Sequence, residues 1–170
     1  MNFSKKYKVK GDNVKKILKI ILAIILIALS TICIFIVDKD STNNISQAKT
    51  TSTSDIQLIA RAINGEARGE PYEGQVAVGA VILNRVKDSR FPNSISGVIY
   101  QPGAFTAVSD GQINASISEG STVYKAAQDA MNGWDPTGGC VYYFNPATAT
   151  NKWIWSRPLI KTIGKHRFCK

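Results

Sequence analysis

The sequence predicts a mostly helical α+β domain with a small antiparallel β ribbon, preceded by one apolar N-terminal segment. Residues 20–37 are apolar and uncharged, residues 55–131 repeat apolar side chains at helical spacing, and residues 140–144 are aromatic and β-branched, as is typical of a strand. At 170 residues, the chain has room for one such segment and one small domain with its own core.

The N-terminal part has the pattern of a membrane anchor. Seven lysines lie within residues 5–19, and the 18 uncharged residues 20–37 follow them. A helix of that length spans about 27 Å, close to the thickness of a bilayer core. The lysines predict a basic cytoplasmic segment at 1–19, a transmembrane anchor at 20–37 and an exported domain. A cleaved signal peptide is the alternative, since Ala28-Leu29-Ser30 ends in small residues, and the protein would then be secreted.

The remaining chain divides into a linker and a domain. Residues 38–54 are polar with one large aliphatic side chain, Ile45, and predict a flexible linker before a domain at 55–170. Residues 1–54 hold 9 basic and 3 acidic side chains, and residues 55–170 hold 12 and 9, so the domain carries only +3 of the formal +9. That balance gives no reason to expect a nucleic-acid partner. The sequence has a single histidine, His166, which excludes metal sites that need two histidine ligands. We expect neither a metal nor a cofactor.

Two helices are expected in the first part of the domain. Ser54 and Gln57 form a capping box that opens a short helix ending at Asn64-Gly65. Pro71 can take the first turn of a second helix, which is apolar nearly all round as far as Val86. The second helix is therefore expected at the centre of the domain.

Shorter elements are expected in the second part. One helix covers 95–100, and another is capped by Ser121 and ends before Gly133. Residues 140–144 predict a strand and residues 161–168 a weaker one, which together would form the antiparallel ribbon.

A candidate catalytic acid lies in the motif GEARGEP, at the junction of the first two helices. A carboxylate held against apolar neighbours at such a junction favours the protonated form that a general acid needs, and Glu66 is the candidate. The alternative is that Glu66, Glu70 and Glu73 are solvated charges favoured by the helix dipole. Glu70 and Glu73 fit that alternative better, because they flank Pro71 at the start of a helix.

Aromatic and amide side chains gather in three segments, 100–106, 142–146 and 153–155. Aromatic faces beside Gln, Asn and Thr side chains suit a sugar polymer, whose rings have apolar faces and whose substituents need hydrogen-bond partners. The alternative is packing in the core, which is expected for Tyr142 or Tyr143, for Phe144 and for one Trp. Because side chains alternate along a strand, Tyr143 is expected to face away from Tyr142 and Phe144.

The domain resembles the catalytic domain of the bacterial spore cortex-lytic cell wall hydrolases that act in germination. The resemblance runs from about residue 55 to residue 168 and is carried by LIARAINGEARGEPYEGQVAVGAVILNRV, FPNSISGVIYQPGAF, NGWDPTGGCVYYFNPATATNKWIWSRP and IGKHRF. It implies a lysozyme-like fold of the lytic transglycosylase kind, acting on peptidoglycan glycan strands, in particular spore cortex with muramic δ-lactam. It also implies that the first Glu of GEARGEP, Glu66, is the catalytic acid.

The expected reaction breaks the bond between N-acetylmuramic acid and N-acetylglucosamine. Glu66 donates a proton to the glycosidic oxygen and then accepts one from the muramic C6 hydroxyl, which closes a 1,6-anhydro ring. A hydrolytic muramidase of the vegetative wall is the alternative. Residues expected to bind the glycan are Gln101, Phe105, Thr106, Tyr143, Asn145, Trp153 and His166.

The chain departs from the best-known family members in two respects. Those members carry a peptidoglycan-binding domain ahead of the catalytic one, where this chain has the anchor and linker. Targeting is therefore expected from the membrane location or from a partner, and the resemblance suggests regulation by a separate membrane protein. The second departure is the pair Cys140 and Cys169, which are either two thiols or a disulfide across the ribbon.

Two other functions would use parts of the same sequence. A cysteine peptidase would use Cys140 and His166, but Cys140 enters a strand directly after Gly-Gly, whereas nucleophilic cysteines usually lie at helix N-termini. A non-catalytic wall-binding module would keep the aromatic groove without the acid, and the intact GEARGEP motif argues against it.

Overall fold

The computed structural model describes residues 15–26 and 52–170, in a chain that divides into two units, Met1–Thr50 and Thr51–Lys170. In the first unit, residues 15–26 are helical. Most of the predicted anchor, most of the linker and residues 1–14 lie outside the described residues. Within 15–26 and 52–170, no helix is both long and apolar enough to cross a membrane.

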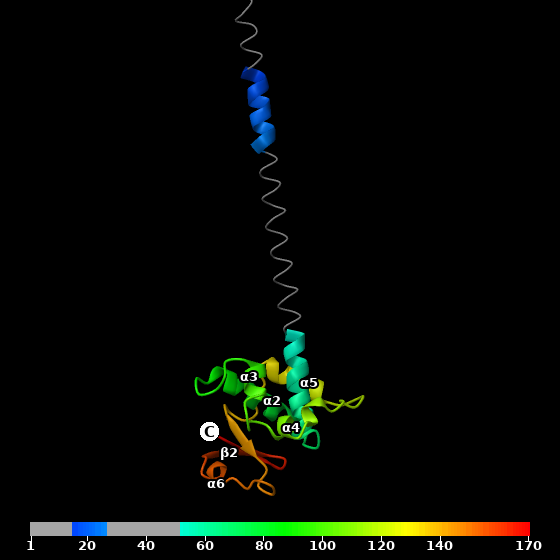
Figure 1. Cartoon of the computed structure of the whole chain (residues 1–170), viewed down its shortest axis with the longest axis vertical. Helices are drawn as coiled ribbons and strands as arrows, with labels where there is room; N and C mark the ends of the chain where they lie inside the picture. Colours follow the sequence, from blue (N-terminus) through cyan, green and yellow to red (C-terminus); the bar gives the residue numbers. More distant parts are fainter. Residues whose placement is uncertain (1–14, 27–51) are drawn as a thin grey trace, which may run out of the picture. The chain divides into compact units, whose positions relative to one another are not determined.

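The second unit is built around α2 (Tyr72–Lys87), which is buried on nearly all sides as its apolar sequence predicts. α5 (Val123–Met131) and α3 (Ile95–Ile99) pack against it, and a helix at 52–67 contributes fully buried isoleucines to the same core. Figure 1 shows α2 among these helices, with β2 and α6 at the opposite end of the unit from the start of the 52–67 helix.

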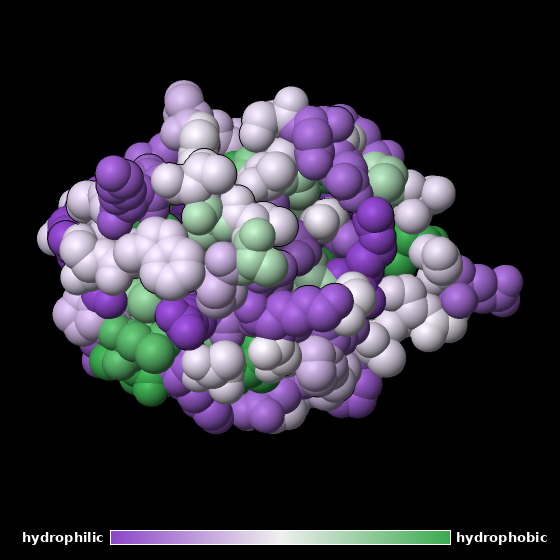
Figure 2. All heavy atoms as spheres, turned by 90° about the horizontal axis from the view of Figure 1, so that it is seen from below, coloured by the Kyte–Doolittle hydropathy of each residue, from purple (hydrophilic) through white to green (hydrophobic). Residues whose placement is uncertain are grey.

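A three-stranded antiparallel sheet completes the unit. β1 (Tyr142–Phe144), β2 (Leu159–Ile163) and β3 (His166–Cys169) are arranged in the order β1-β3-β2. Phe168 on β3 is fully buried against residues of α2, which attaches the sheet to the helices. Seen from the end that carries β2 and α6, the surface is mostly hydrophilic, and its hydrophobic residues form small separate patches (Figure 2).

The sequence predicts a ribbon of two strands, whereas the structure has a sheet of three. Residues 161–168 do not form one strand, because the chain reverses at Gly164, which has a φ of +58°. Glycine adopts this left-handed conformation without the steric penalty that a side chain imposes. The reversal adds a third strand to the sheet.

The first helix also differs from its prediction. It is helical from 52 to 67, so Ser54 lies inside it instead of capping it, and Asn64-Gly65 does not end it. Gly65 stays helical because its missing side chain leaves room for Ala107, with which a Cβ at residue 65 would collide. A tertiary contact thus overrides the local signal for a helix end.

The other predicted helices are confirmed with small shifts. α3 ends at Ile99, and Gly133 has the positive φ expected just past a helix end. Thr122 directly precedes α5 without a side-chain cap, and the hydroxyl of Ser121 accepts a hydrogen bond from the N–H of Val123 at 3.4 Å. The sequence does not predict the three short helices, because a single turn shows no periodicity. They are α4 (Thr106–Ser109), the 3₁₀ helix η1 (Gln112–Asn114) and α6 (Lys152–Trp155).

Cys140 and Cys169 are free, buried thiols, so the disulfide does not form. Burial raises the pKa of both thiols. A raised pKa leaves less of the reactive thiolate, which weakens the case for a cysteine nucleophile.

Candidate active site

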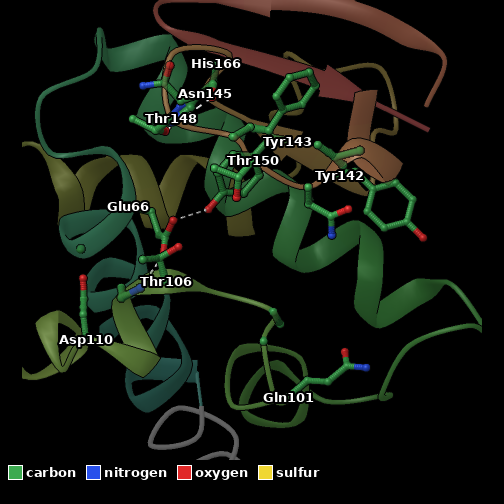
Figure 3. A pocket seen from close by; sticks show the side chains of 18 of the residues that line it. Glu66, Gln101, Thr106, Asp110, Tyr142, Tyr143, Asn145, Thr148, Thr150 and His166 are labelled. Atoms are coloured by element: carbon green, nitrogen blue, oxygen red, sulfur yellow. Dashed lines mark hydrogen bonds between the residues drawn. The ribbon is translucent and has the colours of Figure 1, made fainter. Parts of the chain in front are cut away.

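Glu66 lies in the last turn of the 52–67 helix, half-buried, with a hydrogen bond to each oxygen of its carboxylate. The backbone N–H of Ala107 donates to Oε1 at 2.6 Å, and the hydroxyl of Tyr143 donates to Oε2 at 3.0 Å. Figure 3 shows Glu66 between α4, which carries Thr106, and β1, which carries Tyr143. Three segments that are distant in sequence therefore fix one carboxylate.

The local sequence explains how α4 reaches Glu66. Ala107 is the second residue of α4, and the first N–H groups of a helix have no partner within it. Phe105 is extended and buried before this turn, and Gly65 allows the turn to approach the helix that carries Glu66. The free N–H of Ala107 is thus directed at the carboxylate.

Glu66 opens into a cavity of about 720 Å³. The loop with Gln101 and the turn with Thr106 lie on one side of Glu66, and Asn145 and His166 lie on the other (Figure 3). The predicted glycan-binding residues that line this cavity are Gln101, Thr106, Tyr143, Asn145, Trp153 and His166.

Phe105, the other predicted binding residue, does not line the cavity. Its side chain is buried in the core, and its ring centroid lies 6.5 Å from that of Tyr143. An aromatic residue next to a site residue is as readily core as binding surface, and the local sequence alone does not separate the two.

Several lining residues were missed. Thr148, Thr150 and Asn151 follow Asn145 in the stretch NPATATN, whose hydroxyl and amide groups could have signalled the cavity wall. Asp110 and Arg85 gave no such signal, since each stands alone among residues of other kinds. Tyr142 was expected to face away from Tyr143, yet both line the cavity, because Tyr142 packs beside Trp153 at its rim.

Comparison with known proteins identifies the fold. Residues 69–169 match the family model described as Cell Wall Hydrolase. The chain belongs to that family.

The relatives of this cell wall hydrolase include a spore cortex-lytic enzyme of Bacillus cereus, 66% identical over 119 residues, which are 70% of this chain and 45% of that enzyme. The chain covers 35–48% of the length of the spore cortex-lytic enzymes that it matches.

Two solved structures are similar to this chain. The catalytic domain of the Bacillus cereus SleB protein matches with a TM-score of 0.64 and 66% identity, covering 69% of this chain and 91% of that one. The catalytic domain of the germination-specific lytic transglycosylase SleB from Bacillus anthracis matches with the same TM-score and identity, and the match covers 68% of this chain and 93% of that one.

The surroundings of Glu66 shift the pKa values of two neighbouring residues, Tyr143 and His166. Burial of the phenol and the adjacent Glu66 carboxylate hold the pKa of Tyr143 well above its ordinary value, so the hydroxyl keeps its proton. Burial lowers the pKa of His166, which favours the neutral imidazole near pH 7. The ring of His166 lies 5.2 Å from that of Tyr143, and its Nδ1 is buried without a hydrogen-bond partner.

Two other glutamates near this site, Glu70 and Glu73, contact the β2–β3 hairpin. Glu70 accepts a hydrogen bond from the backbone N–H of Lys165 at 2.8 Å, beside the turn at Gly164. Glu73 forms an ion pair of 2.9 Å with Lys161 on β2. Both contact the β2–β3 hairpin, and neither lines the cavity that contains Glu66.

Substituting Gly65 tests the close approach of α4. We expect Gly65→Ala to displace α4, to lower stability by about 1–3 kcal/mol through overpacking, and to lower the activity proposed below roughly 10- to 100-fold through misplacement of the donor to Glu66. Helix propensity alone predicts the opposite sign for stability. Thermal unfolding and an assay of that activity measure the two effects.

Gly69→Ala is the matched control, because a Cβ at residue 69 would meet nothing within 4 Å. It should leave both stability and activity near those of the parent. If the two alanine variants behaved alike, the close approach at Gly65 would not matter.

Proposed function

We propose that this domain cleaves the glycan strands of peptidoglycan between N-acetylmuramic acid and N-acetylglucosamine, with Glu66 as the catalytic acid of a lysozyme-like site. The observation that carries the proposal is the carboxylate of Glu66, fixed through both oxygens at a cavity lined by aromatic, amide and hydroxyl groups. The similarity to spore cortex-lytic enzymes supports spore cortex as the substrate and germination as the process.

The two donors to Glu66 suggest which oxygen carries the catalytic proton. A backbone N–H can only donate, so Oε1, which faces Ala107, remains an acceptor throughout. A hydroxyl both donates and accepts, so Tyr143 can turn to accept from a protonated Oε2. Oε2 is therefore the oxygen that holds the proton.

The reaction then proceeds by two proton transfers through Glu66. Oε2 gives its proton to the glycosidic oxygen, the bond to the muramic C1 breaks, and positive charge develops at C1. The ionised carboxylate, again accepting from Tyr143, takes the proton of the muramic C6 hydroxyl while O6 bonds to C1. The products are a 1,6-anhydro sugar and a free 4-hydroxyl on N-acetylglucosamine, and no second carboxylate is needed.

The lining residues are suited to holding the glycan across this carboxylate. Gln101, Thr106 and Asn145 offer donors and acceptors for hydroxyl and acetamido groups, and Nδ1 of His166 has no protein partner. Trp153 is 47% exposed, which leaves part of its ring available to stack on a sugar. We assign all five to substrate binding.

Hydrolysis is the second candidate, because a second carboxylate, Asp110, lines the same cavity. Asp110 is exposed, and its oxygens accept hydrogen bonds from the backbone and side chain of Gln112. It would serve as the base that activates water in place of the C6 hydroxyl. Transglycosylation is favoured because Glu66 can carry both proton transfers and needs no second carboxylate.

We also propose that residues 20–37 anchor the domain in the membrane, with the catalytic domain on the outer side. The support is the uncharged apolar run and the seven lysines before it. A regulatory membrane protein could then contact the domain at the outer side of the membrane.

Glu66→Gln tests the catalytic acid. The amide keeps the shape of the side chain and can still accept from Ala107, but it has no proton of suitable acidity to donate. We expect cleavage of spore cortex to fall roughly 10²- to 10⁴-fold, measured as released muropeptides. Glu70→Gln is the matched control from the same motif and should retain most of the activity. Cleavage by Glu66→Gln at the parent's rate would contradict the assignment.

Mass spectrometry of the released muropeptides distinguishes the two candidate reactions. Transglycosylation gives 1,6-anhydro ends, and we expect these from the parent and from Asp110→Asn. Reducing ends that disappear in Asp110→Asn would instead establish hydrolysis with Asp110 as base.

The anchor is tested by expressing the full chain in a bacterium and fractionating the cells. We expect the protein in the membrane fraction at its intact mass, and Ile25→Lys to reduce that fraction because a charge in the bilayer core is costly. Recovery outside the membrane, with a mass lacking the segment up to Ser30, would support a cleaved signal peptide instead.

A further inference from the structure

Arg85 is a buried cation that the proposed reaction does not use. It lies in the last turn of α2 and is only 7% exposed. Burial lowers its pKa, but arginine ordinarily titrates so far above neutrality that the guanidinium stays charged. Among residues 52–170, none of the ion pairs includes Arg85. Because an unpaired buried charge is costly, its other contacts must account for it.

One set of contacts joins Arg85 to β1. Its Nε donates to the carbonyl oxygen of Val141 at 2.7 Å, and its guanidinium carbon lies 5.8 Å from the ring centroid of Tyr142. These two residues directly precede Tyr143, whose hydroxyl donates to Oε2 of Glu66. Arg85 therefore contacts the segment that supplies one donor.

A second contact joins Arg85 to α4. The guanidinium carbon lies 5.1 Å from the ring centroid of Phe105, which is the N-cap residue of α4. Ala107, two residues further on, donates its N–H to Oε1 of Glu66. The other donor segment is thus packed against the same guanidinium.

We infer that Arg85 is a positioning residue, which holds β1 and α4 at the spacing that lets both donors reach the carboxylate of Glu66 at once. The planar guanidinium suits this task, because its faces stack on aromatic rings while its edge donates a hydrogen bond. Lysine carries the same charge but has no planar group that could stack on the rings. The inference rests on the proposed role of Glu66 and adds a residue that acts through it.

Arg85→Lys and Arg85→Met test the inference in steady-state kinetics on soluble peptidoglycan fragments. Misplacement of the donors should lower kcat roughly 10- to 100-fold and leave KM within about twofold, since Arg85 holds the acid and not the glycan. Loss of kcat in the lysine variant as well would show that charge alone is insufficient.

Arg90→Met is the matched control. Arg90 also lies over an aromatic ring, Phe91, at 5.7 Å, but it is exposed and pairs with Asp88. It should keep the parent's kcat and KM. An equal loss of kcat in Arg90→Met would overturn the inference.

Chemical rescue separates positioning from a general loss of folding. Millimolar guanidinium ion should restore part of the kcat of Arg85→Ala and should not affect Arg90→Met. Thermal unfolding in the same buffers checks that the variants are folded, and Arg85→Lys provides the kinetic test if the smaller side chains prevent folding.

The remaining outcomes are decisive as well. A rise in KM with kcat unchanged would make Arg85 a substrate contact and overturn the inference, as would unchanged kinetics in both Arg85→Lys and Arg85→Met. If Glu66→Gln is inactive while the Arg85 variants behave like the parent, only this inference fails. If Glu66→Gln is active, the proposed function fails first.

Discussion

The two hydrogen bonds to the carboxylate of Glu66 are the constraint on which the site depends. They come from a helical turn and a strand that are not neighbours in sequence, and each reaches a different oxygen. For both to form, the 52–67 helix, α4 and β1 must meet at one point. The contacts at Gly65, Phe105 and Arg85 can be understood as means of bringing these elements together.

The motif GEARGEP connects this point to the rest of the domain. Its first glutamate opens into the cavity, and its second, Glu70, accepts from the turn of the β2–β3 hairpin. The two carboxylates, four residues apart, thereby join the helical core to the sheet that carries Tyr143 and His166. One short motif thus provides the proposed acid and attaches the sheet from which that acid receives a donor.

The elements with a clear period could be predicted from sequence, as could the residue at the centre of the site. α2 and α5 have enough turns to show their apolar faces, and Glu66 stands in a motif with a strong resemblance. α4 could not be predicted, because one turn has no period, and its role depends on a contact with Gly65 that the sequence presents as a helix end. Arg85 and Asp110 carry no local pattern, since only the fold brings them to the cavity. Phe105 is the opposite case: its neighbours in sequence suggest a groove, whereas its side chain is packed in the core.

A crystal structure of the Glu66→Gln variant with a bound peptidoglycan tetrasaccharide would test the central claim most directly. We expect a muramic glycosidic oxygen about 3 Å from the carboxamide of residue 66, on the side that faces Tyr143, with a neighbouring sugar against Trp153. A glycan bound in the cavity with every glycosidic oxygen beyond hydrogen-bond reach of residue 66 would contradict it.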